Sequence, residues 1–265
     1  MEFRTLKFEE PAPGLGLLTL NRPEKLNAIN LGMIEELHEL YLRLCGPTSV
    51  RVVVMTGAGR GFCSGADLMD AEMLEKAPHL FADAATFLVE VQKKYSNMIL
   101  ELRRLPQPII AAVNGPAAGG GMCLVLASDI VYVGPRAKFI ASFINLGLSG
   151  GELGTTYFLP RLVGLSRAAE ILYTGRPVGA EEAARIGLAV RLVEEDKLLE
   201  SALETARTML TKSLAGLRQT KEALTRNLNA PGLEAAIEFE NRNQAICAFT
   251  GDFQKAVAAF VHKKD

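Results

Sequence analysis

Two glycine-rich stretches, each directly after an apolar run, contain the groups that could perform chemistry. The first, Asn114–Asp129, follows the apolar run Ile109–Val113 and carries three glycines, Gly119–Gly121, where a buried helix could begin. The second, Gly57–Leu68, follows the apolar run Val50–Met55. The first amides of a helix have no partner within it, so with the helix dipole they suit a negatively charged oxygen. Two such junctions could together form an oxyanion hole, which stabilises charge on a carbonyl oxygen. For the three glycines alone, a close helix–helix contact is the alternative.

Six segments, in the order and spacing of the family, resemble the crotonase (enoyl-CoA hydratase/isomerase) superfamily over essentially the whole chain. They are Asn21-Arg-Pro-Glu-Lys-Leu-Asn-Ala-Ile29, Ser64-Gly-Ala-Asp-Leu68, Asn114-Gly-Pro-Ala-Ala-Gly-Gly-Gly121, Ala137-Lys-Phe139, Leu159-Pro-Arg-Leu-Val-Gly164 and Ala258-Ala-Phe-Val261. The resemblance implies an α/β fold: a crotonase spiral of ββα units with a C-terminal helical oligomerisation region. We expect residues 1–195 to form the spiral core with the CoA and acyl sites. Residues 196–265 should form the helical region that builds a homotrimer, or a hexamer as a dimer of trimers.

The resemblance also implies a substrate, a CoA thioester whose carbonyl is polarised toward an enolate. It places the two oxyanion amides on Ala66 and Gly120. Residues implied for CoA binding, mainly through the backbone, are Lys25, Leu26, Ala28, Ser64, Asp67 and Leu68. Arg22 and Lys25 could meet phosphates, while Phe260 and Lys263 match positions that contact the nucleotide of a neighbouring subunit. A solvated surface charge is the alternative for each basic residue.

The acid/base positions are where this sequence departs from the family pattern. Standard hydratases use two glutamates, and the corresponding positions here are Cys123 and Phe143. Neither side chain can act as a carboxylate, so two-glutamate hydration does not transfer to this chain. The position of Cys123 places it among the expected substrate contacts, but the residue lies within an apolar run and is expected to be a buried structural thiol and not a nucleophile. Phe143 is expected to line the acyl pocket.

One carboxylate, Glu152, remains near the expected place, in the loop Gly147-Leu-Ser-Gly-Gly-Glu-Leu-Gly-Thr155. This loop resembles the one that carries a catalytic aspartate in the dienoyl-CoA isomerase and aryl-CoA dehalogenase branches. The isomerase branch has additional carboxylates that Cys123 and Phe143 do not supply, and the dehalogenase branch has a histidine where this chain has Ser96. Neither specific reaction therefore transfers. A carboxylate beside an acyl group could move a proton; a charge favoured by the helix dipole is the alternative. Asp67 and Asp129 are expected to be loop and helix-end residues.

These residues predict an acyl-CoA enzyme, a lyase or isomerase of the enoyl-CoA hydratase/isomerase type, with Glu152 as its single acid/base. Isomerisation needs only one such group. The alternatives are a non-catalytic acyl-CoA-binding member, or a CoA-thioester or C–C hydrolase of the same fold. We expect no metal and no cofactor, because CoA would be part of the substrate.

The helices and strands that must position these residues can be predicted from the pattern of apolar residues and from the positions of prolines, glycines and helix caps. Phe3–Leu20 alternates around Pro11–Gly14 and predicts a β-hairpin, and Asn30 should cap an amphipathic helix. Asp67–Arg104 is charged and contains Pro78, which predicts helices flanking a mobile segment. Further strands are expected at Ile130–Val133 and Lys138–Ala141. From about Ala180 helices predominate, and they are expected at Ala180–Ile186, Lys197–Lys212, Lys221–Asn229, Gly232–Phe249 and Phe253–Lys264.

Bulk properties exclude several functional classes. The chain has 265 residues, is 49% hydrophobic and carries a formal net charge of −1, so neither nucleic acid nor an anionic membrane is an expected partner. No apolar stretch reaches the roughly 20 residues that span a bilayer. The first residues lack the basic and apolar regions of a signal peptide. The four cysteines are scattered, which favours a reducing compartment, and we expect a cytoplasmic protein.

Overall fold

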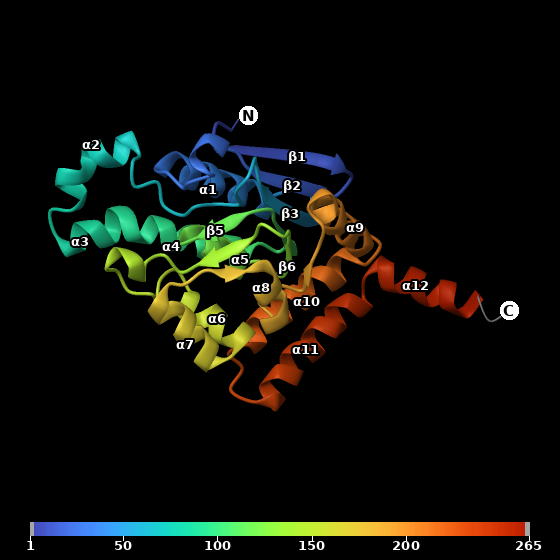
Figure 1. The fold of residues 1–265 in the computed structure, drawn as a ribbon. Helices are drawn as coiled ribbons and strands as arrows, with labels where there is room; N and C mark the ends of the chain where they lie inside the picture. The colour runs from blue at the N-terminus through green and yellow to red at the C-terminus, as the bar shows by residue number, and fades with distance from the viewer. Residues whose placement is uncertain (1–2, 263–265) are drawn as a thin grey trace.

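A computed structural model describes residues 3–262, and two sheets organise the α/β fold (Figure 1). The larger sheet has six strands in the order β1 (Leu6–Ala12), β2 (Leu15–Leu20), β3 (Val52–Gly57), β4 (Ile109–Val113), β6 (Ile130–Val133) and β9 (Arg191–Leu192). Only β1 and β2 pair antiparallel in it, which confirms the predicted hairpin. The smaller sheet has the order β5 (Pro116–Ala118), β7 (Lys138–Ile140) and β8 (Val178–Gly179).

Both faces of the larger sheet are covered, which is why its central strands are apolar without interruption. Alternate residues of β3 enter different cores: Val53 and Met55 join the main core, and Val52 and Val54 join a second one. The main core lies under α1 (Leu31–Cys45), α4 (Lys93–Arg104) and α5 (Gly120–Leu126). The second core is closed by α9 (Leu198–Leu210). The expected division between residues 195 and 196 therefore falls just before a helix that packs on the sheet.

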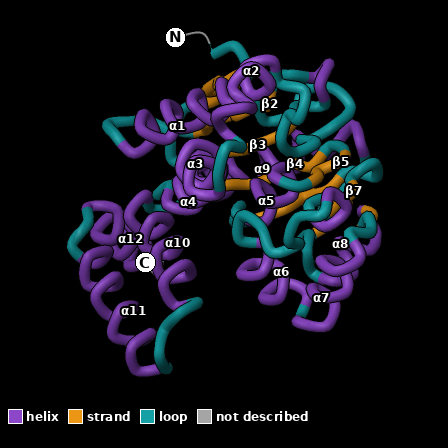
Figure 2. Tube along the Cα trace, turned by 90° about the vertical axis from the view of Figure 1, so that its left-hand side faces the viewer, coloured by secondary structure: helices purple, strands orange, loops and turns teal. Residues whose placement is uncertain are grey.

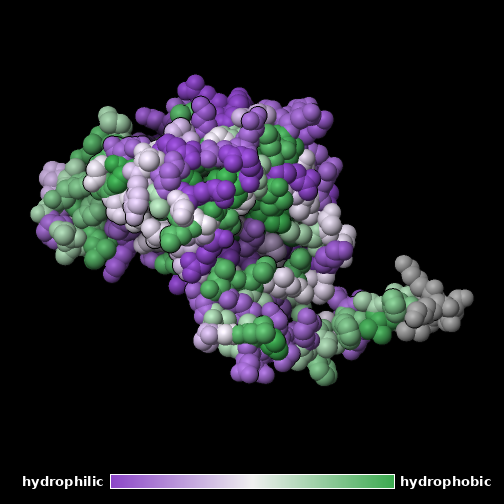
Figure 3. All heavy atoms as spheres, turned by 60° about the horizontal axis from the view of Figure 1, so that its bottom comes forward, coloured by the Kyte–Doolittle hydropathy of each residue, from purple (hydrophilic) through white to green (hydrophobic). Residues whose placement is uncertain are grey.

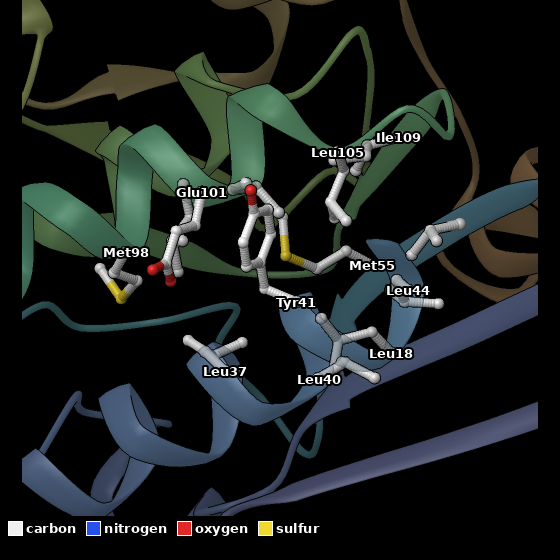
Figure 4. Close-up of a pocket in the computed structure, with 13 residues that line it drawn as sticks. Leu18, Leu37, Leu40, Tyr41, Leu44, Met55, Met98, Glu101, Leu105 and Ile109 are labelled. Atoms are coloured by element: carbon white, nitrogen blue, oxygen red, sulfur yellow. The ribbon is translucent and has the colours of Figure 1, made fainter. Parts of the chain in front are cut away.

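A small void remains in the main core between α1, α4 and the sheet (Figure 4). Its volume is about 20 Å³, and its walls are almost entirely apolar, with Leu37, Tyr41, Met55 and Met98 among them. A void of this size has room for about one water molecule and offers it few polar partners. It is a packing gap and not a ligand site.

Helix α1 begins where predicted, because the side chain of Asn30 accepts a hydrogen bond from the amide of Met33 at 2.9 Å. The next helical region consists of α2 (Ala71–Leu80), α3 (Ala84–Phe87), a π-helical segment (Leu88–Gln92) and α4. Helices flank an interruption as predicted, but the break lies at residues 81–83 and not at Pro78 itself. Proline is the eighth residue of the ten-residue helix α2, where its missing N–H removes only one late hydrogen bond.

The rest of the chain is mostly helical. The remaining α-helices are α6 (Thr155–Val163), α7 (Leu165–Thr174), α8 (Ala180–Ile186), α10 (Leu214–Asn227), α11 (Leu233–Ala248) and α12 (Gly251–His262), and 3-10 turns span Pro23–Lys25, Ile144–Leu146 and Glu195–Lys197. Helix α8 ends as predicted at Gly187, whose φ is +85°. Helix α10 begins at Leu214 and not at Lys221, because the side chain of Ser213 accepts from the amide of Gly216. Helix α12 also begins earlier than predicted.

Buried Lys221 fastens α10 to the sheet. Its ammonium lies 2.7 Å from the carbonyl oxygen of Gln107 and 2.9 Å from Oδ2 of Asp129. The other carboxylate oxygen of Asp129, Oδ1, accepts from Arg103. Asp129 therefore has structural partners beside the start of β4 and directly before β6, which agrees with its expected non-catalytic position. Beyond α10, helices α11 and α12 extend away from the body of the molecule (Figures 1 and 2). Within residues 3–262, no helix combines the length and the hydropathy needed to cross a bilayer.

Candidate active site

The two glycine-rich loops lie against each other at the carboxyl ends of β3 and β4. The amide of Cys63 donates to the carbonyl oxygen of Pro116 at 3.0 Å, and the amide of Ala118 donates back to Cys63 at 2.9 Å. On the other side, Ile29 donates to the carbonyl oxygen of Gly65 at 2.7 Å and accepts from Asp67 at 2.8 Å. These bonds fix the backbone on both sides of Ala66, so the position of its amide is set by the fold.

Ala66 and Gly120 are among the backbone amides of these loops that have no protein acceptor. Across the hydrogen bonds formed within residues 3–262, neither Ala66 nor Gly120 uses its N–H as a donor. For Gly120 the reason is its place as the first residue of α5. The loops approach so closely that Gly65, with φ +93°, has no room for a side chain. A Cβ atom there would lie 2.8 Å from the oxygen of Ala118 and 3.4 Å from the nitrogen of Gly120.

Both amides border one cavity of about 400 Å³. Its walls come from the two loops, from α2 to α4 and from the segment 142–153, and they are mostly apolar. The lining residues are Ser64, Ala66, Asp67, Leu68, Met73, Leu74, Ala77, Phe81, Phe87, Val91, Gln92, Tyr95, Gly119, Gly120, Ser142, Phe143, Leu146, Leu148, Glu152 and Leu153. This size is in the range of sites that hold small organic ligands.

Glu152 lines this cavity and is held from two directions. Its amide donates to Oγ1 of Thr155 at 3.0 Å, and this buried hydroxyl in turn donates to the carbonyl oxygen of Gly150 at 2.9 Å. Its carboxylate accepts a hydrogen bond from the side-chain amide of Gln92, at the end of the π-helical segment. The next residue, Leu153, has a left-handed φ of +47°. A carboxylate that lines a cavity and is bonded only to a neutral donor can exchange protons with a group bound in that cavity.

The other carboxylate of the cavity, Asp67, is already paired. Its Oδ2 lies 2.8 Å from Nη2 of Arg22, and the two side chains are only 6% and 14% exposed. Nη1 of Arg22 donates to the carbonyl oxygen of Ala28 at 2.6 Å. These internal bonds hold the guanidinium of Arg22, and its expected phosphate contact stays a prediction. Arg22 braces residues 21–29 against the loop Gly57–Leu68.

The other residues predicted to bind CoA differ in their exposure. Lys25 is exposed, and its carbonyl oxygen accepts from Oγ of Ser64 at 3.3 Å. Leu26 is half-buried with a left-handed φ of +51°, and Ala28 is buried. Leu68 is 61% exposed at the cavity mouth. None of Lys25, Leu26 and Ala28 lines the cavity, which agrees with a place on the CoA side and not the acyl side.

The two positions that replace the hydratase glutamates differ in their surroundings. Phe143 forms part of the cavity wall. Cys123, expected among the substrate contacts, is not a lining residue. It is buried behind Glu152, and its thiol donates to the carbonyl oxygen of that residue at 3.8 Å. Burial raises the pKa of the Cys123 thiol well above its ordinary value, so the thiol stays protonated and is not a nucleophile.

The predicted contacts of the C-terminal tail lie elsewhere. Phe260 is 66% exposed on α12, which extends from the end of the molecule opposite α2 and α3 (Figure 1). Lys263 lies outside the described residues. The contact predicted for both was with the nucleotide of a neighbouring subunit, and it stays a prediction.

Two residues that matter in the cavity carried no recognisable signal in the sequence. Gln92 stands 60 positions before its partner Glu152, inside a charged helical stretch. Tyr95 donates its hydroxyl to the carbonyl oxygen of Ile29 at 3.1 Å and so ties α4 to the loop of Ala66. Burial raises the pKa of Tyr95 to about 12, which keeps it a neutral donor.

Comparison with known proteins places this geometry in a family. A family model described as enoyl-CoA hydratase/isomerase matches residues 10–265. A Mycobacterium leprae protein named "Probable enoyl-CoA hydratase" is 44% identical over 96% of this chain and 86% of its own length. The 1,2-epoxyphenylacetyl-CoA isomerase of Escherichia coli is 35% identical, over 95% of this chain and 93% of its own. The crystal structure of a monofunctional enoyl CoA isomerase from M. smegmatis superposes with a TM-score of 0.74 at 43% identity, covering 88% of this chain and 98% of that one.

The chain belongs to the enoyl-CoA hydratase/isomerase family, whose members act on acyl-CoA compounds. Its α/β structure, with further helices at the C-terminal end, is the crotonase fold expected from the sequence.

Proposed function

We propose that this chain is an enoyl-CoA isomerase that moves a proton on a CoA-thioester enolate. In this mechanism the amides of Ala66 and Gly120 hold the thioester oxygen, and Glu152 is the single acid/base. The observation that carries the proposal is that Ala66, Gly120 and Glu152 line the same mostly apolar cavity. Among residues 3–262, the amides of Ala66 and Gly120 have no protein acceptor and the carboxylate of Glu152 has no ion pair. Preorganised backbone donors of this kind stabilise charge that develops on a carbonyl oxygen.

The proton transfer balances without a co-reactant. The carboxylate of Glu152 removes a proton from the α-carbon, and the C–H electron pair moves into the thioester carbonyl. The resulting oxyanion accepts hydrogen bonds from both amides. For a β,γ-unsaturated substrate the intermediate is a dienolate, and Glu152 returns the proton to the γ-carbon. The double bond then lies between the α- and β-carbons, and Glu152 is ionised again. Neither water nor a cofactor is consumed.

The surroundings of Glu152 favour isomerisation over hydration. The standard hydratase mechanism needs a second carboxylate to position water, but Cys123 is buried and Phe143 presents a ring. The isomerase names of the E. coli and M. smegmatis relatives support the same reading. A hydrolase or a non-catalytic acyl-CoA binder would use the same cavity, so the decisive experiment must separate these three activities.

The test compares wild type with Glu152→Gln on a panel of enoyl-, dienoyl- and aryl-CoA thioesters. The matched control is Glu204→Gln, the same change on the exposed face of α9. We expect isomer formation to fall by about 100-fold or more in Glu152→Gln, as for loss of a general acid/base, with saturated acyl-CoA affinity kept. Release of free CoA by wild type would identify a hydrolase instead. Tight binding without product would identify a binder, and either result would refute the proposal.

We also propose that helices α10–α12 join copies of this chain into a homotrimer or a dimer of trimers, in the cytoplasm. Large apolar side chains on these helices support this assembly, because Leu233 is 76% exposed and Phe249 is 88% exposed. Light scattering coupled to size exclusion should give three or six chain masses. A monomer mass at micromolar concentration would refute this part of the proposal.

A further inference from the structure

The far side of the cavity, away from the two amides, is built from apolar side chains. They come from α2, α3, the π-helical segment and the loop before Glu152, and they are Met73, Leu74, Phe81, Phe87, Val91 and Leu148. We infer that this site takes a thioester whose acyl group is long and apolar, of about eight carbons or more, and not a short or polar one. The inference rests on the proposed function for the placement of the thioester.

The size of the cavity supports a long acyl group. An apolar protein cavity of about 150 Å³ is large enough for benzene. A volume of about 400 Å³ therefore has room for roughly a dozen carbon atoms, with the thioester taking part of it. A four-carbon acyl group would leave most of the apolar wall in contact with water or with empty space. Filling that wall with methylene groups supplies both hydrophobic and dispersion energy.

Most polar side chains of the cavity already have a protein partner, which argues against a polar acyl chain. The Tyr95 hydroxyl donates to a backbone oxygen, the Gln92 amide donates to Glu152, and Asp67 is paired with Arg22. The hydroxyl of Ser142 lies at the oxyanion end, since a Cβ atom on Gly119 would lie 3.0 Å from its oxygen. A hydroxyl or carboxylate further along the acyl chain would lose its water and meet a wall that is mostly apolar.

The mouth of the cavity continues as an apolar rim. The rings of Phe81 and Phe87 lie 5.2 Å apart, and Phe81 is 62% exposed. Leu74 is 50% exposed on the same side, and Leu148 is 52% exposed on the opposite side. The space-filling view shows apolar side chains gathered on the surface at the left, the end of the molecule formed by α2 and α3 (Figure 3). A long chain that runs along this rim would cover surface that is otherwise costly to expose.

Binding of saturated acyl-CoAs tests the inference separately from the chemistry, since they have no double bond to move. We expect the dissociation constant to fall from butyryl- to octanoyl- to dodecanoyl-CoA, by up to about fourfold per methylene, and by at least 100-fold over the series. Phe81→Ala and Leu74→Ala should each weaken dodecanoyl-CoA binding several-fold and leave butyryl-CoA unchanged. Leu42→Ala, an exposed leucine on α1, is the matched control and should change neither.

Equal affinity for all three acyl lengths, or equal weakening of all three by Phe81→Ala, would overturn this inference and leave the proposed isomerisation intact. Failure of the protein to bind any of the three would refute both, because the CoA-thioester site itself would then be absent.

Discussion

Gly65→Ala tests whether the close approach of the two loops builds the oxyanion hole. Gly65 has φ +93°, and a Cβ atom there would lie 2.8 Å from the carbonyl oxygen of Ala118. This is a backbone oxygen that cannot rotate away, so one loop must move. The new methyl group would also lie 3.4 Å from the nitrogen of Gly120, one of the two proposed donors. The substitution should therefore displace a donor and not only strain a turn.

The two effects have different expected sizes. Holding a residue other than glycine in this backbone region costs about 1–3 kcal/mol of stability, which would lower Tm by several degrees. Displacing one oxyanion donor should reduce kcat by about 100- to 1,000-fold. Gly164→Ala is the matched control, because Gly164 has φ +82° but nothing within 4 Å of its Cβ position. It should reproduce the loss of stability and keep kcat.

The assay combines thermal unfolding with kcat on the best substrate of the acyl-CoA panel, below the Tm of every variant. A folded Gly65→Ala protein with wild-type kcat would refute the assignment of the oxyanion hole. Equal loss of activity in Gly65→Ala and Gly164→Ala would show that backbone strain far from the cavity is enough to reduce kcat. That result would also count against the assignment of the oxyanion hole.

Two further predictions concern titratable groups. Hydrogen bonds from Arg176 lower the pKa of Glu170 and of Glu182 below the ordinary 4.5, so their contribution to stability is present above that pH and is lost as the pH falls through the lowered values. The Tm difference between wild type and Arg176→Met should shrink on acidification, and a constant difference from pH 7 to pH 3 would contradict this account. Burial raises the pKa of Cys63 to about 12 and also raises that of Cys123, so at pH 8 Ellman's reagent should label only the other two cysteines of the native protein. Labelling of all four without unfolding would contradict it.

Local signals explain what the sequence could predict about the fold. Asn30 was identified as a cap, and the hairpin at Phe3–Leu20 as paired strands, because their signals lie within a few residues. The break was predicted at Pro78 but lies after Leu80, because a proline late in a helix removes one hydrogen bond and does not end the helix at once. The start of α10 was missed although it carries a local signal, the cap that Ser213 forms with the amide of Gly216.

The site depended on resemblance and on contacts far apart in the chain. Matching motifs pointed to Ala66, Gly120 and Glu152, and the fold brings all three to one cavity. Arg22 was expected to meet phosphates, and the structure also pairs it with Asp67, 45 positions later. No local pattern reveals such a partner, and the same holds for the hydrogen bond from Gln92 to Glu152. The division of the chain into core and oligomerisation region remains a prediction.

The most direct test of the central claim is exchange of the α-proton of a bound acyl-CoA in D₂O, followed by mass spectrometry. It reports formation of the enolate whatever product follows. Wild type should incorporate deuterium at the α-carbon. In Glu152→Gln the exchange rate should fall by about 100-fold or more, with unchanged affinity. Exchange at the wild-type rate in Glu152→Gln would show that another group moves the proton, and would contradict the account.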